Sequence, residues 1–329
     1  MANLHSFSRR GLLLGGGVAM TTMALAACGE SKSASSSSTS SGASDAKVSL
    51  TFWGWAPGYK EAVELWNKKN PNTQVTWIAT EASRKIYPKM LTAVKANNAP
   101  DLAQVGYEAL PSFVIQDAVQ DIKEWAGDGD KNFTAAGAKS VNLSGAVYGI
   151  PVDTAPMAMI YNKALLDSLK IKAPKTWDEF ASAARAVKKA DPKASLTYFS
   201  SDPNFLAGLV RQAGGRWYDV TDSTVKVIMT QDAASRKVAD FWQKLINEGS
   251  IPVHEGYTPQ VYKQMNEDTL ISELYGIWDT ALIAQNVPKG KGKWAVAPLP
   301  EWPDRPGGAD MGGVSHSGAQ GFKERRSGR

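Results

Sequence analysis

The side chains best able to do chemistry in this chain are tryptophans and carboxylates, because cysteine and histidine are almost absent. The 329 residues include one cysteine, Cys28, and three histidines, His5, His254 and His316, against 11 tryptophans. A Ser-His-Asp triad, Cys-His catalysis and a histidine-rich metal site all need residues that the chain largely lacks. No glycine loop suited to phosphate follows a predicted strand. The sequence therefore favours a binding function over an enzymatic one, with no metal and no cofactor.

Tryptophan faces and carboxylates are together the side chains that bind a carbohydrate. A sugar presents flat C–H faces, which stack on aromatic planes, and a girdle of hydroxyls, which bond to carboxylates and amides. Trp55 lies just beyond a predicted strand at 48–53, at the strand end where ligands of parallel sheets bind. Trp53 alternates with it and suits a site wall or the core equally, whereas Trp66 is typical of the core. Trp217, which follows two glycines, is a further open candidate.

The charge distribution disfavours nucleic acid as a partner. The formal net charge is +5, from 37 basic and 32 acidic residues. Six of the basic residues lie in a predicted signal or in the terminal stretch, namely Arg9, Arg10, Lys323, Arg325, Arg326 and Arg329. Without them and Glu324, 31 basic residues face 31 acidic ones. The body is close to neutral and offers no basic field for a polyanion.

Residues 1–27 have the layout of an export signal, with Arg9 and Arg10 before an apolar run that ends in small residues. The segment SRRGLL resembles a twin-arginine signal, and LAAC resembles the lipobox of bacterial lipoproteins, which ends at the lipidated cysteine, here Cys28. Residues 28–46 are rich in serine, alanine and glycine and are typical of a disordered tether. We therefore predict an extracytoplasmic protein, anchored by lipid to the outer face of the cytoplasmic membrane.

The body is predicted to form two α/β lobes. Strands at 48–53, 74–79 and 101–105 alternate with helices at 59–69 and 84–97, which indicates a parallel sheet covered by helices. A second α/β pattern begins near Tyr161 and includes a capping box at Thr176–Glu179. The predicted boundaries are 47–154 for the first lobe, 155–266 for the second, 267–313 for a return to the first, and 314–329 for an aberrant tail.

Five segments resemble the family 1 extracellular solute-binding proteins of ABC importers, the group of maltose- and oligosaccharide-binding proteins. They are LTFW at 50–53, NAPDL at 98–102, YGIPVDT through IYNK at 148–163, PKTWDEF at 174–180, and GIW with APLP at 276–300. The likeness covers about residues 46–313. It implies a two-lobed α/β fold of the periplasmic-binding-protein type II, hinged near Pro151–Pro156 and closing over a sugar. It also implies a monomer that delivers its ligand to permease subunits.

The resemblance also implies which residues hold the ligand. Glu108, Asp153 and Trp278 match family positions that bind or stack on sugar, and Asp202 and Asn204 match further contact positions. Tyr107 and Asp279 are neighbours of these positions. Two alternatives stay open: Asp153 as a hinge or cap residue, and Asp279 as the start of a helix.

The terminal stretch departs from the family. After Gly312-Gly313 the family continues into a strand and further helices, whereas residues 314–329 show no periodicity and are abruptly basic. Codons compatible with these residues encode a family-like strand and an alanine-rich helix when shifted by one nucleotide. A frameshift would explain the departure, and the chain would then lack part of both lobes.

Two other functions compete with sugar binding. A polyamine or a compatible solute would also use tryptophan faces and carboxylates, through cation–π contacts. An exported glycosidase needs only a pair of carboxylates, for which Glu108 and Asp153 are candidates.

Overall fold

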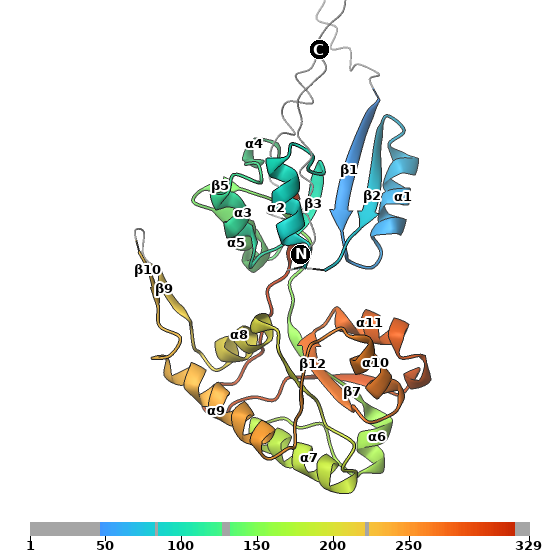
Figure 1. Ribbon diagram of the computed structural model, residues 1–329, viewed down its shortest axis with the longest axis vertical. Coiled ribbons are helices and arrows are strands. Elements are labelled where there is room, and N and C mark those ends of the chain that lie inside the picture. The colour runs from blue at the N-terminus through green and yellow to red at the C-terminus, as the bar shows by residue number, and fades with distance from the viewer. Residues whose placement is uncertain (1–46, 83–84, 127–131, 221–223, 320–329) are drawn as a thin grey trace, which may run out of the picture. The chain divides into compact units, whose positions relative to one another are not determined.

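The computed structural model describes residues 47–82, 85–126, 132–220 and 224–319 (Figure 1). The predicted export signal, the lipidation site Cys28 and the tether lie outside the described residues. Within the described residues, no helix has the length and apolar character needed to cross a bilayer.

The first lobe contains the predicted parallel sheet. Strand β1 (Val48–Gly54) pairs in parallel with both β2 (Thr73–Ala79) and β3 (Leu102–Gly106). The helices between and after these strands are α1 (Tyr59–Lys69), α2 (Tyr87–Lys95), α3 (Leu110–Ile115), α4 (Lys123–Ala126) and α5 (Ala135–Val141). Short strands follow as β4 (Asn142–Leu143), β5 (Ala146–Val147) and β6 (Ile150–Pro151). The strand–helix alternation predicted for residues 48–105 is thereby confirmed.

Helix α1 does not bury the apolar stripe that its sequence suggests. Leu65 is 55% exposed and Trp66 is 47% exposed, while Tyr59 is the one buried residue of the helix. The indole N–H of Trp66 donates to the Thr73 carbonyl at 3.0 Å. Trp66 is therefore not a core residue: α1 lies beside the edge strand β2 (Figure 1), where little of the core can reach its stripe.

The second lobe has its own core, built around a three-stranded antiparallel sheet of order β12-β7-β13. Its strands are β7 (Met157–Asn162), β12 (Ser272–Gly276) and β13 (Trp294–Pro298), with shorter pairs β8 (Phe199–Ser200) with β11 (Val253–His254) and β9 (Tyr218–Val220) with β10 (Val225–Val227). Its helices are α6 (Lys163–Ser168), α7 (Trp177–Ala190), α8 (Pro203–Gln212), α9 (Ala233–Asn247), α10 (Pro259–Asn266), α11 (Asp279–Asn286) and the short η3 (Pro288–Gly290).

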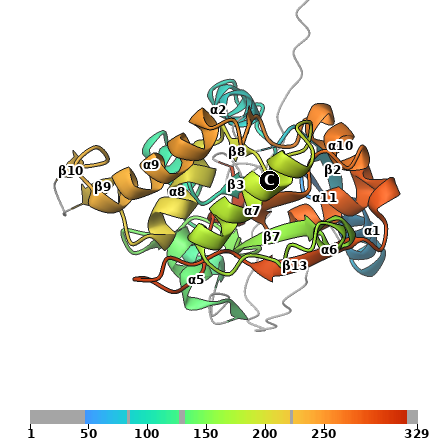
Figure 2. The ribbon, with the colours of Figure 1, turned by 90° about the horizontal axis from the view of Figure 1, so that it is seen from below.

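Helix α7 begins where the sequence predicted. The hydroxyl of Thr176 accepts from the Glu179 N–H at 3.2 Å, and the Glu179 carboxylate accepts from the Lys175 N–H at 2.7 Å. The first bond satisfies an N–H group that the first helical turn would leave unpaired, and the second ties the residue before the cap to the helix. Helices α7 and α9 lie side by side (Figure 2), with Trp177 and Trp242 in edge contact at 5.8 Å.

The predicted return to the first lobe at residue 267 is wrong. β12 and β13 flank β7 along its whole length, and their neighbours Ile271, Leu274 and Leu299 belong to the second-lobe core. Strand β7 is buried at five of its six positions, so it needs a hydrogen-bonded partner on both edges. The second lobe therefore extends to about Met311.

Two chain segments cross between the lobes side by side. The predicted crossing at Pro151–Pro156 pairs with residues 309–314. Ala155 donates to the Gly312 carbonyl at 3.0 Å and accepts from the Met311 N–H at 2.9 Å, and the Val152 N–H donates to the Val314 carbonyl at 3.0 Å. Gly312 and Gly313 both have positive φ angles, 106° and 149°, a conformation that favours glycine. We call these two paired segments the hinge ribbon.

The tail expected to be irregular contains a strand. β14 (Val314–Gly318) lies between β3 and β6 and is antiparallel to both, which completes the order β2-β1-β3-β14-β6. Its buried positions are Ser315 and Ser317, and the Ser315 hydroxyl donates to the Val105 carbonyl at 3.2 Å. The buried and exposed residues of β14 alternate, but this alternation does not show in the hydropathy of the sequence because the buried side chains are serines.

His316 lies on the other face of β14, where its Nε2 hydrogen-bonds to the Tyr59 hydroxyl at 2.8 Å. Burial lowers the pKa of His316 from its usual 6.5 to about 4. Since the folded pKa is below the unfolded one, this neutral histidine stabilises the fold above pH 6.5 and the contribution is lost as the pH falls toward 4.

We expect the difference in unfolding free energy between wild type and His316→Gln to shrink by about 1.4 kcal/mol per pH unit below pH 6.5, by about 3 kcal/mol in all. Urea unfolding at several pH values measures this difference. A difference that does not vary with pH would contradict the placement of His316 between Tyr59 and Phe52.

Candidate functional site

A cavity of about 290 Å³ is lined by residues of both lobes and of the hinge ribbon. Three residues predicted to bind ligand line it: Tyr107 and Glu108 from the first lobe and Asn204 from the second. The lining is completed by Ala136, Ser140, Thr154, Ala207, Arg211, Asp310, Met311 and Gly312. The structure thus brings predicted residues that are about a hundred positions apart to one cavity, which is where a two-lobed receptor would hold its ligand.

The end of strand β3 positions the residues that line the first-lobe side of this cavity. Tyr107 and Glu108 directly follow its last residue, Gly106. The hydroxyl of Tyr87 accepts from the Gly106 N–H at 3.0 Å and donates to Glu108 Oε1 at 3.0 Å. The Glu108 carboxylate folds back over Gly106 so closely that any β-carbon there would collide with it. Glu108 is exposed, yet its carboxylate is held in place by Tyr87. A group that accepts hydrogen bonds from ligand hydroxyls needs both properties.

The two N-terminal tryptophans support this side without lining the cavity. The Trp55 ring meets the Tyr87 ring edge-on at 6.2 Å, and the Trp55 backbone N–H donates to the buried Gln104 Oε1 at 2.8 Å. Trp53 is half-buried, with the Lys89 ammonium 5.6 Å from its ring centroid. Both pack against the first-lobe core. Trp55 is therefore linked to Glu108 through Tyr87, one residue removed from the cavity.

Helix α8 positions the residues that line the second-lobe side of the cavity. Asp202 caps the helix, with its Oδ1 accepting from the Asn204 N–H at 3.0 Å. Asn204, Ala207 and Arg211 all line the cavity, at the spacing of one helical face. The Arg211 guanidinium donates to the Asp310 carbonyl on the hinge ribbon. Sequence reasoning missed Arg211, although its position seven residues after Asn204 on a predicted helix was a usable signal.

Asp153 takes the hinge position that was left open as an alternative. Its Oδ1 accepts from the Val314 N–H at 2.8 Å, and its backbone carbonyl accepts from the Tyr107 hydroxyl at 2.9 Å. Burial raises the pKa of Asp153 above its usual value, and burial with the nearby Asp153 charge raises the pKa of Tyr107 to about 12. Its neighbour Thr154, not Asp153 itself, lines the cavity. Asp153 therefore fastens the first lobe to the hinge ribbon.

Trp278 and Trp217 lie outside the cavity, and Asp279 is inaccessible. The Trp278 ring covers Gly276, and its indole N–H donates to the Tyr257 hydroxyl at 2.9 Å. Asp279 is completely buried and is the first residue of α11, which matches the alternative role rather than ligand contact. Trp217 is half-buried against the second-lobe core.

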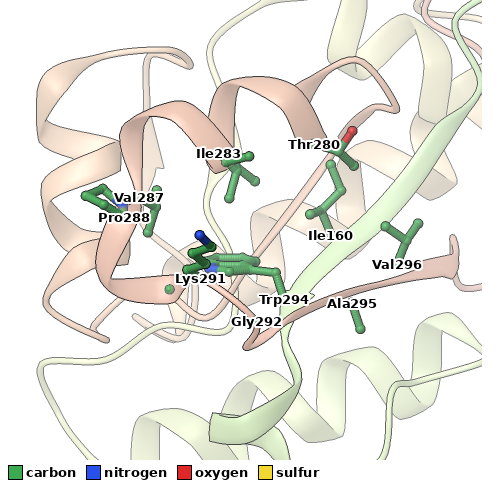
Figure 3. Close-up of a pocket in the computed structure, with 12 residues that line it drawn as sticks. Ile160, Thr280, Ile283, Val287, Pro288, Lys291, Gly292, Trp294, Ala295 and Val296 are labelled. Carbon is green, nitrogen blue, oxygen red and sulfur yellow. The ribbon is translucent and has the colours of Figure 1, made fainter.

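A second cavity of about 430 Å³ lies between α11 and β13 (Figure 3). Its lining is mainly apolar, with Trp294 at its centre and Lys291 as its one charged residue. It has no carboxylate to accept bonds from hydroxyls and contains no predicted site residue. It is thus a poorer match to a polyol than the smaller cavity. No group of metal-ligating side chains was found among the described residues.

The family model described as a bacterial extracellular solute-binding protein matches residues 54–322. The chain belongs to this family. The family resemblance and the predicted two-lobed α/β fold are both confirmed.

Curated relatives of this solute-binding protein are longer than the chain. It is 26% identical to the arabinooligosaccharide-binding protein of Bacillus subtilis over 90% of this chain and 69% of that protein. It is also 26% identical to the arabinooligosaccharide-binding protein of Halalkalibacterium halodurans, over 81% of this chain and 62% of that protein.

Two solved structures share the fold of this solute-binding protein at a TM-score of 0.77. One is the ABC transporter associated binding protein from B. animalis subsp. lactis in complex with β-1,6-galactobiose, at 28% identity over 83% of this chain and 68% of that one. The other is the galacto-N-biose-/lacto-N-biose I-binding protein from Bifidobacterium longum in complex with lacto-N-biose, at 29% identity over 85% and 73%.

Proposed function

We propose that this solute-binding protein is the extracytoplasmic receptor of an ABC importer and binds a sugar or oligosaccharide between its two lobes. The observation that carries the proposal is the shared cavity, in which Glu108 of the first lobe and Asn204 of the second lie on one ligand-sized space. A carboxylate and an amide supply acceptors and donors for sugar hydroxyls. In support, both solved relatives described above were determined with a disaccharide bound.

The polar groups of the cavity favour a neutral polyol over a polyamine. Its lining includes Arg211 together with the acids Glu108 and Asp310. A protonated polyamine carries hydrogen-bond donors only, so it cannot accept from the Arg211 guanidinium, which is always charged. A sugar instead uses both signs, because its hydroxyls donate to carboxylates and accept from Arg211.

The glycosidase alternative loses the carboxylate pair, Glu108 and Asp153, that the sequence offered for it. Asp153 holds the Val314 N–H on the hinge ribbon and does not line the cavity that contains Glu108. Glycoside hydrolysis needs two carboxyl groups flanking the scissile bond. The other acid of the cavity, Asp310, accepts from the Gly312 N–H through its Oδ1 at 2.6 Å and so belongs to the hinge ribbon. The geometry therefore favours a receptor over a glycosidase.

Delivery to the importer and anchoring are further parts of the proposal. Lipidation of Cys28, export through the twin-arginine route, a monomeric state and contact with permease subunits are supported by the N-terminal motifs and by the family. The residues of the anchor lie outside the described part of the chain.

Replacing Glu108 by glutamine is expected to weaken sugar binding about tenfold. The substitution keeps the shape but removes the charge that strengthens bonds from hydroxyls, a loss of about 1.4 kcal/mol. Titration of intrinsic tryptophan fluorescence measures the affinity. Glu124→Gln, on the exposed α4, is the matched control and should bind as wild type does. Equal affinities of wild type and Glu108→Gln would remove Glu108 from the site.

A further inference from the structure

Two buried carboxyl groups flank Trp278 in the sequence, five residues before it and one residue after it. Glu273, on β12, is 1% exposed, and Asp279, at the start of α11, is 0% exposed. Glu273 Oε1 accepts from the Tyr198 hydroxyl, but Glu273 Oε2 and both carboxyl oxygens of Asp279 receive no hydrogen bond from another group among the described residues. Neither acid takes part in an ion pair found in that part of the chain. Two ionised carboxylates in such a place would be strongly unfavourable.

A proton shared between the two acids resolves this difficulty. The side chains of Glu273 and Asp279 are within hydrogen-bonding reach of each other. Ionised carboxylates only accept hydrogen bonds, so a bond between two of them requires a proton on one. Burial raises the pKa of both groups, and the Asp279 charge raises that of Glu273 further.

We propose that Glu273 and Asp279 share one proton at neutral pH, and that this proton positions Trp278, which lies outside the cavity, to contact a ligand that extends beyond it. Only the second half rests on the proposed function. Both acids are positioning residues, since neither is accessible to a ligand.

The pair is connected to Trp278 by two routes. Asp279 is its neighbour in the chain, so a displacement of the Asp279 side chain moves the start of α11 and the indole with it. The second route runs through rings: Trp278 donates to the Tyr257 hydroxyl at 2.9 Å, and Tyr257 meets Tyr275 edge-on at 4.9 Å. Tyr275 lies two residues after Glu273 on β12, so the two side chains are on the same face of that strand. A second negative charge in the pair would disturb both routes.

The tyrosines and the histidine around the pair keep the same protonation state between pH 7 and 9. They are Tyr198, Tyr257, Tyr262 and Tyr275, with Asp202 and His254 beside the tyrosines. Burial raises the pKa of all four tyrosines above the usual 10, so they stay protonated. Burial lowers the pKa of His254, which is neutral there. Asp202 lies near Tyr275.

The sign of the pH dependence follows from the raised pKa. Above the ordinary carboxyl pKa of about 4.3 the unfolded chain has lost this proton while the folded chain keeps it. The folding equilibrium constant should therefore fall as pH rises, by up to about tenfold per pH unit for one proton, until the folded state also releases it.

Glu273→Gln tests the shared proton, because its amide can donate permanently to Asp279 and still accept from Tyr198. Urea unfolding from pH 7 to 9 should show the wild-type folding constant falling by up to about tenfold per pH unit relative to the variant. Glu255→Gln, an exposed acid of the same lobe, should keep the wild-type slope. Parallel profiles of wild type and Glu273→Gln would overturn the proposal.

Two further measurements keep the parts separate. Infrared spectroscopy of the wild type should show the carbonyl stretch of a protonated carboxylic acid at pH 7, and its absence would overturn the proposal even if Glu273→Gln failed to fold.

Calorimetric titration with lacto-N-biose and β-1,6-galactobiose should show affinity falling from pH 7 to 9 in wild type but not in the variant. Affinity that varies equally in both would overturn the positioning of Trp278. If neither these nor any other sugar binds at any pH, the proposed function and the positioning role fail together, while the unfolding profiles still decide the shared proton.

Discussion

Replacing Trp278 by alanine is expected to lower oligosaccharide affinity by about thirtyfold, or about 2 kcal/mol, the loss expected for a tryptophan that stacks on the part of the ligand extending beyond the Glu108–Asn204 cavity. Its indole is half-buried and oriented by the bond to Tyr257 and by contact with Gly276. An aromatic face fixed in this way stacks on a sugar ring with little loss of conformational entropy. Isothermal titration calorimetry with the best-binding sugar measures the loss.

Two variants separate stacking from general damage. Trp278→Phe retains an aromatic face and should recover part of the affinity, whereas Trp125→Ala, at a residue 55% exposed on α4, should bind as wild type does. A folded Trp278→Ala that binds within twofold of wild type would show that Trp278 is not a ligand contact.

Replacing Trp177 by alanine is expected to destabilise the protein by about 4 kcal/mol, as for other buried tryptophans. Trp177 is 1% exposed and contacts the rings of Phe180 at 5.3 Å and Trp302 at 5.8 Å, among others. Its indole N–H donates to Gln212 Oε1 at 3.1 Å, so the substitution also leaves a buried acceptor without its partner. Urea unfolding measures the change.

The exposed Trp66 supplies the matched control for Trp177. Trp66→Ala removes the same side chain from a position 47% exposed and should cost about 1 kcal/mol or less. Similar losses at the two positions would contradict the central role of Trp177 in the second-lobe core.

Features encoded by neighbouring residues were predictable from the sequence. The strands at 48–54 and 102–106, the helix at 59–69 and the cap at Thr176 depend on periodicity and capping within about ten residues. The placement of Glu108 and Asn204 at one cavity followed from the family resemblance rather than from spacing.

Features that depend on distant partners were not predictable in the same way. β12 and β13 lie in the segment 267–313 that was predicted to return to the first lobe, but the sheet that a strand joins depends on its partner, here β7. β14 was missed because its buried side chains are serines, which bond to Val105 and to each other rather than pack as apolar groups. Asp279 directly follows the half-buried Trp278, yet it is completely buried and interacts with Glu273, a residue outside the predicted site.

The central claim, that the cavity bounded by Glu108 and Asn204 receives a neutral sugar, is tested most directly by calorimetric titration of the wild-type protein against a panel of disaccharides, oligosaccharides and spermidine. The account predicts saturable heat with at least one sugar, weakened by Glu108→Gln, and none with spermidine. Binding of spermidine in the absence of any sugar response would contradict it.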